Sequence, residues 1–307
     1  MKIAITGGAG FIGSHIVDFY IQQGHTVVVI DNFTTGDKKN IHPKASVIEI
    51  DIISPELISI FEKEKFDVVN HHAAQLNLRV STEKPIFDAT VNILGTINVL
   101  EAVAKSNVSQ FIFASTGGAL YGEYTGHLFK ETDDVSPQAP YGISKLSAEY
   151  YVQYFAKKFG FNFTVLRYTN VYGPRQNAKG EAGVVSIFIN SLLDSNVPTI
   201  NGTGKQTRDY VYVTDIAKVN LFVLGLKQNL ILNVSCETET SVVDVYNEIN
   251  NALHSDIEPI FGASILGEVL RSSCSNECLQ SNFNWTPPTT LQEGIQQTVE
   301  YFVSQRQ

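Results

Sequence analysis

A glycine-rich turn that directly follows a short apolar segment constrains the fold of this chain most strongly. Residues 2–6 are typical of a buried strand, and Gly7-Gly8-Ala9-Gly10-Phe11-Ile12-Gly13 leads from them into an amphipathic stretch. Glycines permit a tight strand-to-helix turn and let backbone N–H groups approach a pyrophosphate, while the helix N-terminus adds partial positive charge. A tight turn alone would also explain the glycines, but the strand before and the helix after favour a dinucleotide site. Its predicted contacts are Gly7, Gly10, Phe11, Ile12 and Gly13.

The first half of the chain alternates apolar and amphipathic segments. Strands are predicted over residues 2–6, 26–30, 47–50, 67–70, 110–114 and 163–167, and helices over 11–23, 55–63, 88–106 and 141–159. This order predicts a parallel sheet with helices on both faces. Right-handed crossovers then give the doubly wound, Rossmann-type α/β fold.

The second half is less regular. Residues 170–183 are rich in Gly, Asn and Pro and predict a long connection, which in compact domains is usually functional. Helices are predicted over 184–195, 214–226, 242–254 and 291–304, and short strands over 199–200, 210–213 and 231–234. We therefore expect a Rossmann domain over 1–170, to which segments near 205–225 return, and a smaller α+β lobe over 171–307. A cleft between the two is the expected ligand site.

Composition excludes several classes of protein. The formal net charge of -9 argues against nucleic acid or an anionic membrane as the main partner. No uninterrupted apolar run reaches the roughly 18–20 residues of a membrane helix, and the first residues do not resemble a signal peptide. Cys274 and Cys278 lie four apart, but no second cysteine pair or nearby histidine completes a metal site. With Cys236, they are expected to be free thiols in the cytoplasm.

Acidic residues at two predicted strand ends favour NAD as the dinucleotide. Asp31 ends the second strand, where a carboxylate accepts hydrogen bonds from the adenosine ribose and repels a 2′-phosphate. A turn or capping aspartate is the alternative. Lys38 and Lys39 keep NADP open, although the nearer cofactor candidates carry no positive charge: Asn32, Thr34, Thr35 and Gly36. Asp51, followed by Ile52, either faces the adenine or only ends a strand.

Tyr141 and Lys145 form the predicted catalytic pair. They lie four residues apart at the start of a predicted helix, so they share one face. A nearby cation favours the phenolate and lowers the tyrosine pKa from about 10, which would let it act as a base. On an arbitrary helix, a Tyr and a Lys at this spacing would be surface residues without a catalytic role. Their position downstream of a dinucleotide turn favours a catalytic role.

Together these segments resemble the extended short-chain dehydrogenase/reductases, and within them the UDP-glucose 4-epimerase group. The resemblance rests on Gly7–Gly13, Asp31-Asn32, His72-Ala73-Ala74, Tyr141–Lys145, Arg167–Arg175 and Gln206–Val211. It is dense up to about residue 222 and thinner as far as Asn284-Trp285 and the last helix.

The resemblance implies roles for further residues. Tyr141 would take the proton of the sugar 4-hydroxyl, and Lys145 would hold the nicotinamide ribose. Asn170 would contact the diphosphate, and Arg208 would pair with a phosphate, unless it forms a salt bridge with Asp209. Further cofactor contacts would be Ala73, Ala74, Asn92, Ser115 and Tyr168, and the nucleotide base would lie near Val184, Thr199 and Asn201.

One departure from the family pattern concerns the group that helps Tyr141. Many relatives place Ser or Thr where this chain has Gly117, so Thr116, Ser115 or a water would have to replace that hydroxyl, and Thr116 is the candidate. The family's 4,6-dehydratases have an acid in the next two positions. Gly118 and Ala119 carry none, which favours a redox-only cycle over dehydration.

A second departure lies near the C-terminus. Ile265 occupies the place of a family arginine ahead of Gly267-Glu268, and Arg271 is the candidate replacement for its phosphate contact. The usual Asp-x-Ser-Lys-Ala segment is replaced by residues 275–279. Ser272, at the position that limits the sugar's C2 substituent, is small enough to admit an N-acetyl group.

We therefore expect a UDP-hexose 4-epimerase that interconverts UDP-glucose and UDP-galactose with bound NAD, and the small Ser272 extends the expectation to the N-acetylated pair. The alternatives are another NAD-dependent nucleotide-sugar enzyme, such as a UDP-glucuronate epimerase or a reductase, and a non-catalytic NAD-binding sensor. The resemblance also implies a homodimer through the helices over 88–106 and 141–159. Their apolar outer positions include Tyr150, Tyr151, Tyr154 and Phe155.

Overall fold

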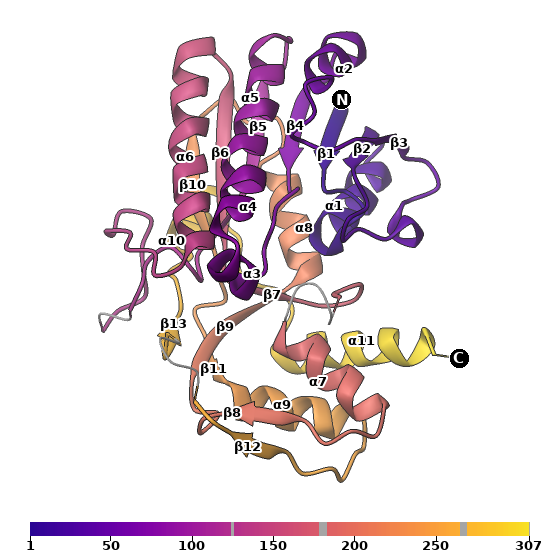
Figure 1. The fold of residues 1–307 in the computed structure, drawn as a ribbon, viewed down its shortest axis with the longest axis vertical. Helices are drawn as coiled ribbons and strands as arrows, with labels where there is room; N and C mark the ends of the chain where they lie inside the picture. The colour runs from indigo at the N-terminus through magenta and orange to yellow at the C-terminus, as the bar shows by residue number, and fades with distance from the viewer. Residues whose placement is uncertain (124–125, 178–182, 265–268, 307) are drawn as a thin grey trace.

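A seven-stranded parallel sheet forms the centre of the larger part of this computed structural model, which describes residues 1–123, 126–177, 183–264 and 269–306 (Figure 1). The strand order is β10-β6-β5-β4-β1-β2-β3, and every neighbouring pair is parallel. The bounds are β1 (Lys2–Thr6), β2 (Thr26–Asp31), β3 (Ser46–Glu49), β4 (Val68–His71), β5 (Gln110–Thr116), β6 (Asn162–Tyr168) and β10 (Leu230–Val234). The chain order reverses between β1 and β4. Ligands of doubly wound sheets bind at the carboxyl ends of the strands beside such a reversal.

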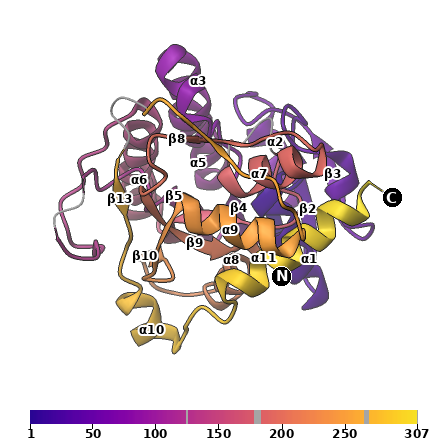
Figure 2. The same ribbon diagram turned by 90° about the horizontal axis from the view of Figure 1, so that it is seen from below.

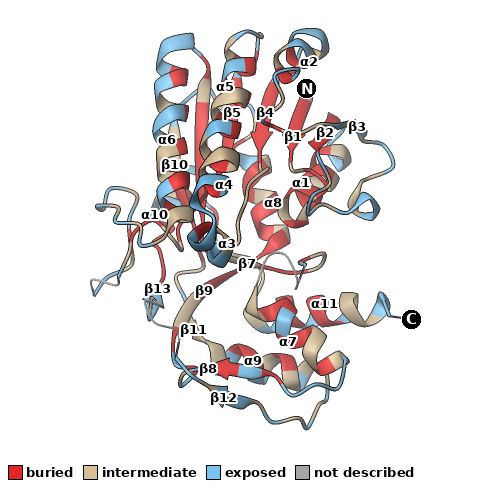
Figure 3. Ribbon diagram, in the orientation of Figure 1, coloured by how far each residue is buried: buried red, intermediate tan, exposed pale blue. Residues whose placement is uncertain are grey.

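Helices cover both faces of this sheet, as the alternating pattern predicts. One face packs against α2 (Leu57–Glu64), α5 (Thr96–Ala104) and α6 (Pro140–Phe159), and the other against α1 (Phe11–Gln22) and α8 (Val213–Phe222). Strands β1, β4, β5 and β6 are buried almost throughout, whereas the edge strand β3 is mostly exposed (Figure 3). The predicted Rossmann-type fold is therefore confirmed.

The helix predicted over residues 88–106 is a more complex segment. It follows α3 (Leu78–Glu83) and consists of α4 (Pro85–Ala89), a π-helical turn, η2 (Thr90–Gly95), and α5. Apolar periodicity did not reveal this turn, because a single turn is too short to establish a period of its own. π-Helical turns inside α-helices occur frequently at functional sites.

By length and composition, one helix of the described chain could cross a membrane. It is Pro85–Ala104, with 44% of its most apolar window buried. This helix is not an uninterrupted apolar run, because Asp88 and Glu101 lie within it. Its inner face packs against α2 and α6, so it is placed as a helix of the protein core.

The smaller lobe contains two short sheets. β9 (Thr207–Tyr212) pairs with β7 (Asn170–Tyr172), β11 (Glu239–Ser241) and β13 (Arg271–Ser272), and β8 (Thr199–Asn201) pairs with β12 (Ile260–Gly262). Helices α7 (Val184–Leu193), α9 (Val242–Ala252) and α11 (Leu291–Ser304) pack together, as Figure 2 shows from below. The sequence missed β7, β11, β12, β13 and α10 (Glu277–Phe283), since such short elements carry little periodicity.

The strand predicted over 231–234 lies within residues 171–307, which were expected to form mainly the smaller lobe, but it belongs to the large sheet. It is β10, which lies beside β6 at the edge of the large sheet. Helix α8 packs against α1, so the chain also returns to the large domain there. We propose that the cofactor domain comprises residues 1–170 together with α8 and β10, and that the rest forms the substrate lobe.

Candidate active site

The glycine-rich turn has the geometry of an anion site. Gly7 adopts a φ of +69°, and its amide donates to the Ile30 carbonyl at 2.9 Å. A Cβ on Gly13 would collide with the Gly7 carbonyl. No side chain caps α1 at Gly10, so its first amides are open to an anionic ligand. This turn fits the pyrophosphate of a dinucleotide.

Asp31 is held beside the turn. Its carboxylate accepts from the amides of Ala9 at 3.0 Å and Phe33 at 2.8 Å. Lys38 is engaged by Glu49 at 2.9 Å and lies over the Phe33 ring, which weakens the case for NADP. The other candidates of this region follow the strand ends: Asn32, Thr34, Thr35 and Gly36 in the loop after β2, and Asp51 and Ile52 after β3.

Asn32 and Asp51 are brought together. The Asn32 amide donates to an Asp51 carboxylate oxygen at 2.7 Å, and the other oxygen accepts from the Ile53 amide at 3.0 Å. Asp51 thus makes the turn contact that the sequence left open, and its other carboxylate oxygen is held by Asn32. Ile52 is buried beneath it.

The loop after β4 lies directly on the glycine turn. A Cβ on Gly7 would touch the backbone of His72 and Ala73, and the Ala73 amide donates to Thr6 Oγ1 at 3.2 Å. Ala74 follows in the same loop. This close packing places the predicted cofactor residues of β1 and β4 side by side at the strand reversal.

His72 joins this loop to Tyr168. Its Nε2 lies 3.1 Å from the Tyr168 hydroxyl, which also accepts from the Asn220 amide at 2.9 Å. Burial, and then the charge of Lys145, lowers the pKa of His72 to about 3, so the ring is neutral. Its buried Nδ1 has no partner among the described residues, which suits a site completed by a ligand.

Asn92 supports the loop from below. Its amide oxygen accepts from the Gln75 amide at 2.9 Å, and its nitrogen donates to the Gln75 carbonyl at 2.8 Å and to Asp88 at 3.0 Å. Asn92 comes from the π-helical turn and is buried. It therefore fixes the loop through Gln75, a residue that the sequence argument did not single out.

Tyr141 and Lys145 lie on the first turns of α6. The Lys145 ammonium donates to the Ala114 carbonyl at 2.8 Å and lies over the Phe113 ring. Burial lowers the pKa of Lys145 to about 8, although Glu149 and Asp88 oppose the shift. Burial, and then Asp88, raises the pKa of Tyr141. The protein by itself therefore shifts this pKa in the direction opposite to the lowering expected from Lys145.

Ser115 belongs to a buried ionic network on the α6 side of β5. Its hydroxyl donates to Glu149 at 2.5 Å, and Glu149 also accepts two hydrogen bonds from Arg167, at 2.8 and 3.1 Å. Breaking a buried pair of this kind typically costs about 3–5 kcal/mol. The Ser115 hydroxyl is therefore part of this buried network, and its hydrogen bond goes to Glu149. The spacing of Glu149, four residues after Lys145, could have indicated this neighbour from the sequence.

Thr116 has the opposite orientation on β5. Among the described residues no group hydrogen-bonds its hydroxyl, which lies 4.0 Å from a Cβ built on Gly118. Asn170 Oδ1 lies 3.4 Å from the same point. A Cβ on Gly117 would instead meet Cys274 Sγ at 3.0 Å. The Thr116 hydroxyl and Asn170 Oδ1 therefore both lie next to position 118, whereas position 117 is directed toward Cys274.

The loop that carries these residues touches the catalytic helix. A Cβ on Gly142 would collide with the Ala119 carbonyl, so the chain after β5 lies against the first turn of α6. Gly142 directly follows Tyr141. The carboxyl end of β5 and Tyr141 thus share one edge of the sheet.

Arg208 and Asp209 have separate roles on β9. Arg208 donates to the Thr207 carbonyl at 2.8 Å. Asp209 is buried and accepts from the hydroxyls of Ser235 and Ser273, at 2.6 and 2.7 Å. The amides of Cys236 and Glu237 also donate to its carboxylate. The groups that contact Asp209 in the described part of the chain are thus hydroxyls and amides, and none of the ion pairs described there joins it to Arg208.

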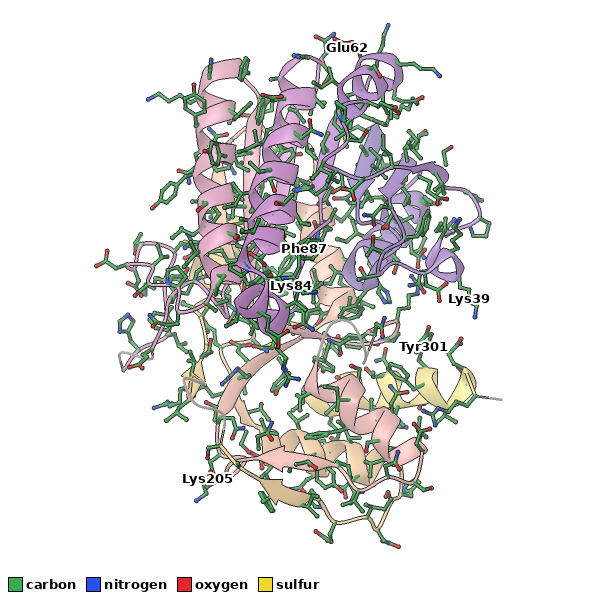
Figure 4. All side chains as sticks on the ribbon, viewed as in Figure 1. Lys39, Glu62, Lys84, Phe87, Lys205 and Tyr301 are labelled. Atoms are coloured by element: carbon green, nitrogen blue, oxygen red, sulfur yellow. The ribbon has the colours of Figure 1, made fainter. Side chains whose placement is uncertain are left out.

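Arg271 forms a bidentate ion pair with Glu239, at 2.6 and 2.9 Å. It also lines a cavity of about 340 Å³ together with Asn201, Lys205 and Gln206. Figure 4 labels Lys205 at this end of the smaller lobe. Thr199 lies on the same strand as Asn201, and Val184 begins α7. Ile265 and Gly267-Glu268 lie outside the described residues.

A doubly wound sheet, an uncapped glycine turn, an acid after β2 and a Tyr–Lys pair on α6 together define a dinucleotide-binding enzyme of the short-chain dehydrogenase/reductase type. The model of the NAD dependent epimerase/dehydratase family matches residues 3–235. A UDP-glucose 4-epimerase of Mycolicibacterium smegmatis is 36% identical over the whole of both chains. The chain therefore belongs to the NAD-dependent epimerase/dehydratase family, within the extended short-chain dehydrogenase/reductases.

Two solved structures resemble the whole chain. A UDP-glucose 4-epimerase with UDP-glucose from Thermotoga maritima has a TM-score of 0.97, with 39% identity over 100% of both chains. A UDP-glucose 4-epimerase complex with NAD from Thermus thermophilus has a TM-score of 0.94, with 36% identity over 99% of both chains.

Proposed function

We propose that this protein is a UDP-hexose 4-epimerase that interconverts UDP-glucose and UDP-galactose with tightly held NAD. The observation that carries the proposal is the Tyr141–Lys145 pair at the sheet edge, beside Gly118 and Ala119, which carry no acid. Family membership and the full-length similarity to UDP-glucose 4-epimerases support it. Ser272 is buried and small, which is compatible with an N-acetyl group on the sugar.

Different residues of the site are assigned to cofactor binding and to proton transfer. The turn over Gly7–Gly13 and Asp31 would hold the dinucleotide, which would supply the hydride acceptor for C4. Tyr141 takes the proton of the 4-hydroxyl and later returns it. The Thr116 hydroxyl hydrogen-bonds the same oxygen, while Lys145 stays cationic beside the phenol.

Binding of the nucleotide is assigned to the smaller lobe. Arg208 pairs with a phosphate, and Asn170 approaches the diphosphate from β7. The cavity beside Asn201 and Arg271 takes the nucleotide end. For Arg271 to contact a phosphate, it would have to share or exchange its pairing with Glu239.

The direct test is incubation of the purified protein with UDP-galactose and no added cofactor. We expect UDP-glucose to accumulate to an equilibrium mixture, since the redox cycle returns the cofactor to its starting state. UDP-N-acetylgalactosamine and UDP-glucuronate complete the panel, which is scored by sugar composition. Stoichiometric NADH formation would instead identify a dehydrogenase, and turnover of UDP-glucuronate alone would identify a different epimerase.

We also propose that the protein is a homodimer through α4 and α6. Tyr150, Tyr151 and Tyr154 are exposed on the outer side of α6, whereas Phe155 is buried. Phe87 on α4, labelled in Figure 4, is exposed as well. Clustered exposed aromatic side chains are typical of interfaces.

We expect sedimentation at micromolar concentration to give the mass of a dimer, and the double variant Tyr150→Glu with Tyr154→Glu to give a monomer, because charge is costly in an apolar interface. Tyr246→Phe, in the interior of the other lobe, serves as the matched control. A monomeric wild-type protein would contradict the proposal.

The three free thiols fit a cytoplasmic location. Recovery of the protein in the membrane fraction of lysed cells would refute this location.

A further inference from the structure

Asp88 is a fully buried carboxylate that the catalytic scheme above does not use. It lies in α4, directly before the π-helical turn, in an otherwise apolar stretch. Its Oδ1 accepts from Gln75 Nε2 at 2.7 Å and Asn92 Nδ2 at 3.0 Å, and its Oδ2 accepts from Ser144 Oγ at 2.6 Å. All three donors are neutral, so no cation is hydrogen-bonded to this charge. Buried acids without such a partner are rare in proteins.

The three donors come from three parts of the candidate site. Gln75 follows the cofactor loop after β4, Asn92 belongs to the π-helical turn, and Ser144 lies between Tyr141 and Lys145 on α6. Asp88 therefore joins the cofactor loop to the catalytic helix. Its carboxylate faces the part of α6 that carries the acid/base pair.

The other charged groups around the pair are already balanced or neutral. Glu149 is held by Arg167 in a bidentate ion pair. His72 is neutral, and burial holds the pKa of His71 well below its usual range, with its ring nitrogens at the hydroxyls of Thr6 and Thr96. The pKa of Lys145 is raised first by Glu149 and then by Asp88, and of these two carboxylates Asp88 is the one to which no cation is hydrogen-bonded.

Resting on the proposed function, we propose that Asp88 is a positioning residue whose buried negative charge balances Lys145 and sets the pH range in which the Tyr141–Lys145 pair works. A negative charge disfavours the phenolate of Tyr141 and favours the ammonium of Lys145, and the pKa of each is shifted upward by Asp88. Removal of the charge lowers both. The acid limb, where Tyr141 ionises, and the alkaline limb, where Lys145 loses its proton, both move to lower pH.

The test compares Asp88→Asn with Ser144→Ala in the NAD-loaded protein. Asp88→Asn keeps the size of the side chain and removes its charge, whereas Ser144→Ala breaks a hydrogen bond and keeps the charge. For Asp88→Asn we expect both limbs of the kcat profile to move by about one pH unit to lower pH, with KM for UDP-galactose changed by less than about threefold. For Ser144→Ala we expect a lower kcat without displacement of the profile.

A second readout requires no sugar. The ultraviolet absorbance of the Tyr141 phenolate, taken as the difference from the same protein with Tyr141→Phe, titrates this group directly, and its midpoint is expected to fall by about one pH unit in Asp88→Asn. This readout separates a failure of the proposed substrate from a failure of the role of Asp88. Should Asp88→Asn not fold, Asp88→Ser removes the same charge and is expected to give the same displacement. Unmoved midpoints, or an equal displacement in Ser144→Ala, would overturn the proposal.

Discussion

Replacement of Tyr141 by phenylalanine is expected to lower kcat for UDP-galactose epimerisation by about 10³-fold or more. General acid–base catalysis typically contributes about 10²–10⁴-fold, and the nearby carboxylates of Asp88 and Glu149 are engaged by Gln75, Asn92 and Ser144 and by Ser115 and Arg167. The phenyl ring preserves the packing at the start of α6. NAD content and thermal midpoint should therefore remain close to the wild-type values, while kcat falls and KM changes little.

Tyr151→Phe is the matched control, because Tyr151 lies on the same helix with its side chain exposed. Loss of that hydroxyl should leave kcat unchanged. Activity of Tyr141→Phe within tenfold of wild type, with the cofactor bound, would show that Tyr141 does not carry the proton. It would also revive the alternative of a non-catalytic NAD-binding sensor.

The sequence predicted those features that depend on neighbours in the chain. The turn over Gly7–Gly13 is recognisable because a strand and a helix adjoin it, and the Tyr141–Lys145 spacing is meaningful because one helix carries both residues. The order of strands and helices gave the doubly wound fold, since crossover handedness leaves few topologies.

The sequence could not predict contacts between distant segments. The commitment of Ser115 to Glu149 depends on how α6 packs on β5, and the balance at Tyr141 depends on Asp88, which lies 53 residues earlier in the chain. Burial also reversed the expected direction of the Tyr141 pKa. A spacing rule counts the nearby cation and does not count the loss of water around the phenol.

Position 117 is a further case of this kind. The family pattern has Ser or Thr where this chain has Gly117, so the sequence indicates that a hydroxyl is missing there. The sequence does not show where a side chain at that position would point. In the structure that direction leads to Cys274 and the Arg167 carbonyl. The Thr116 hydroxyl and Asn170 Oδ1 are instead the groups next to position 118.

Thr116→Val is therefore expected to lower kcat about 10²-fold, because removal of one hydrogen-bond donor to a reacting oxygen typically costs about 10²–10³-fold. Valine keeps the branched shape of threonine, so the end of β5 should remain in place. Steady-state kinetics with UDP-galactose provide the measurement, and the loss should fall on kcat with little change in KM. Thr116→Ser, which keeps the hydroxyl, should retain most of the activity.

Addition of Gly117→Ser to Thr116→Val distinguishes the two positions. A Cβ at residue 117 would lie 3.0 Å from Cys274 Sγ and 3.2 Å from the Arg167 carbonyl, so the new side chain must displace its neighbours. Overpacking of this kind typically costs about 1–3 kcal/mol of stability. We expect the double variant to remain as inactive as Thr116→Val and to unfold at a lower temperature. Recovery of activity in the double variant would show that a hydroxyl at residue 117 reaches the sugar. It would contradict the assignment of the helper hydroxyl to Thr116.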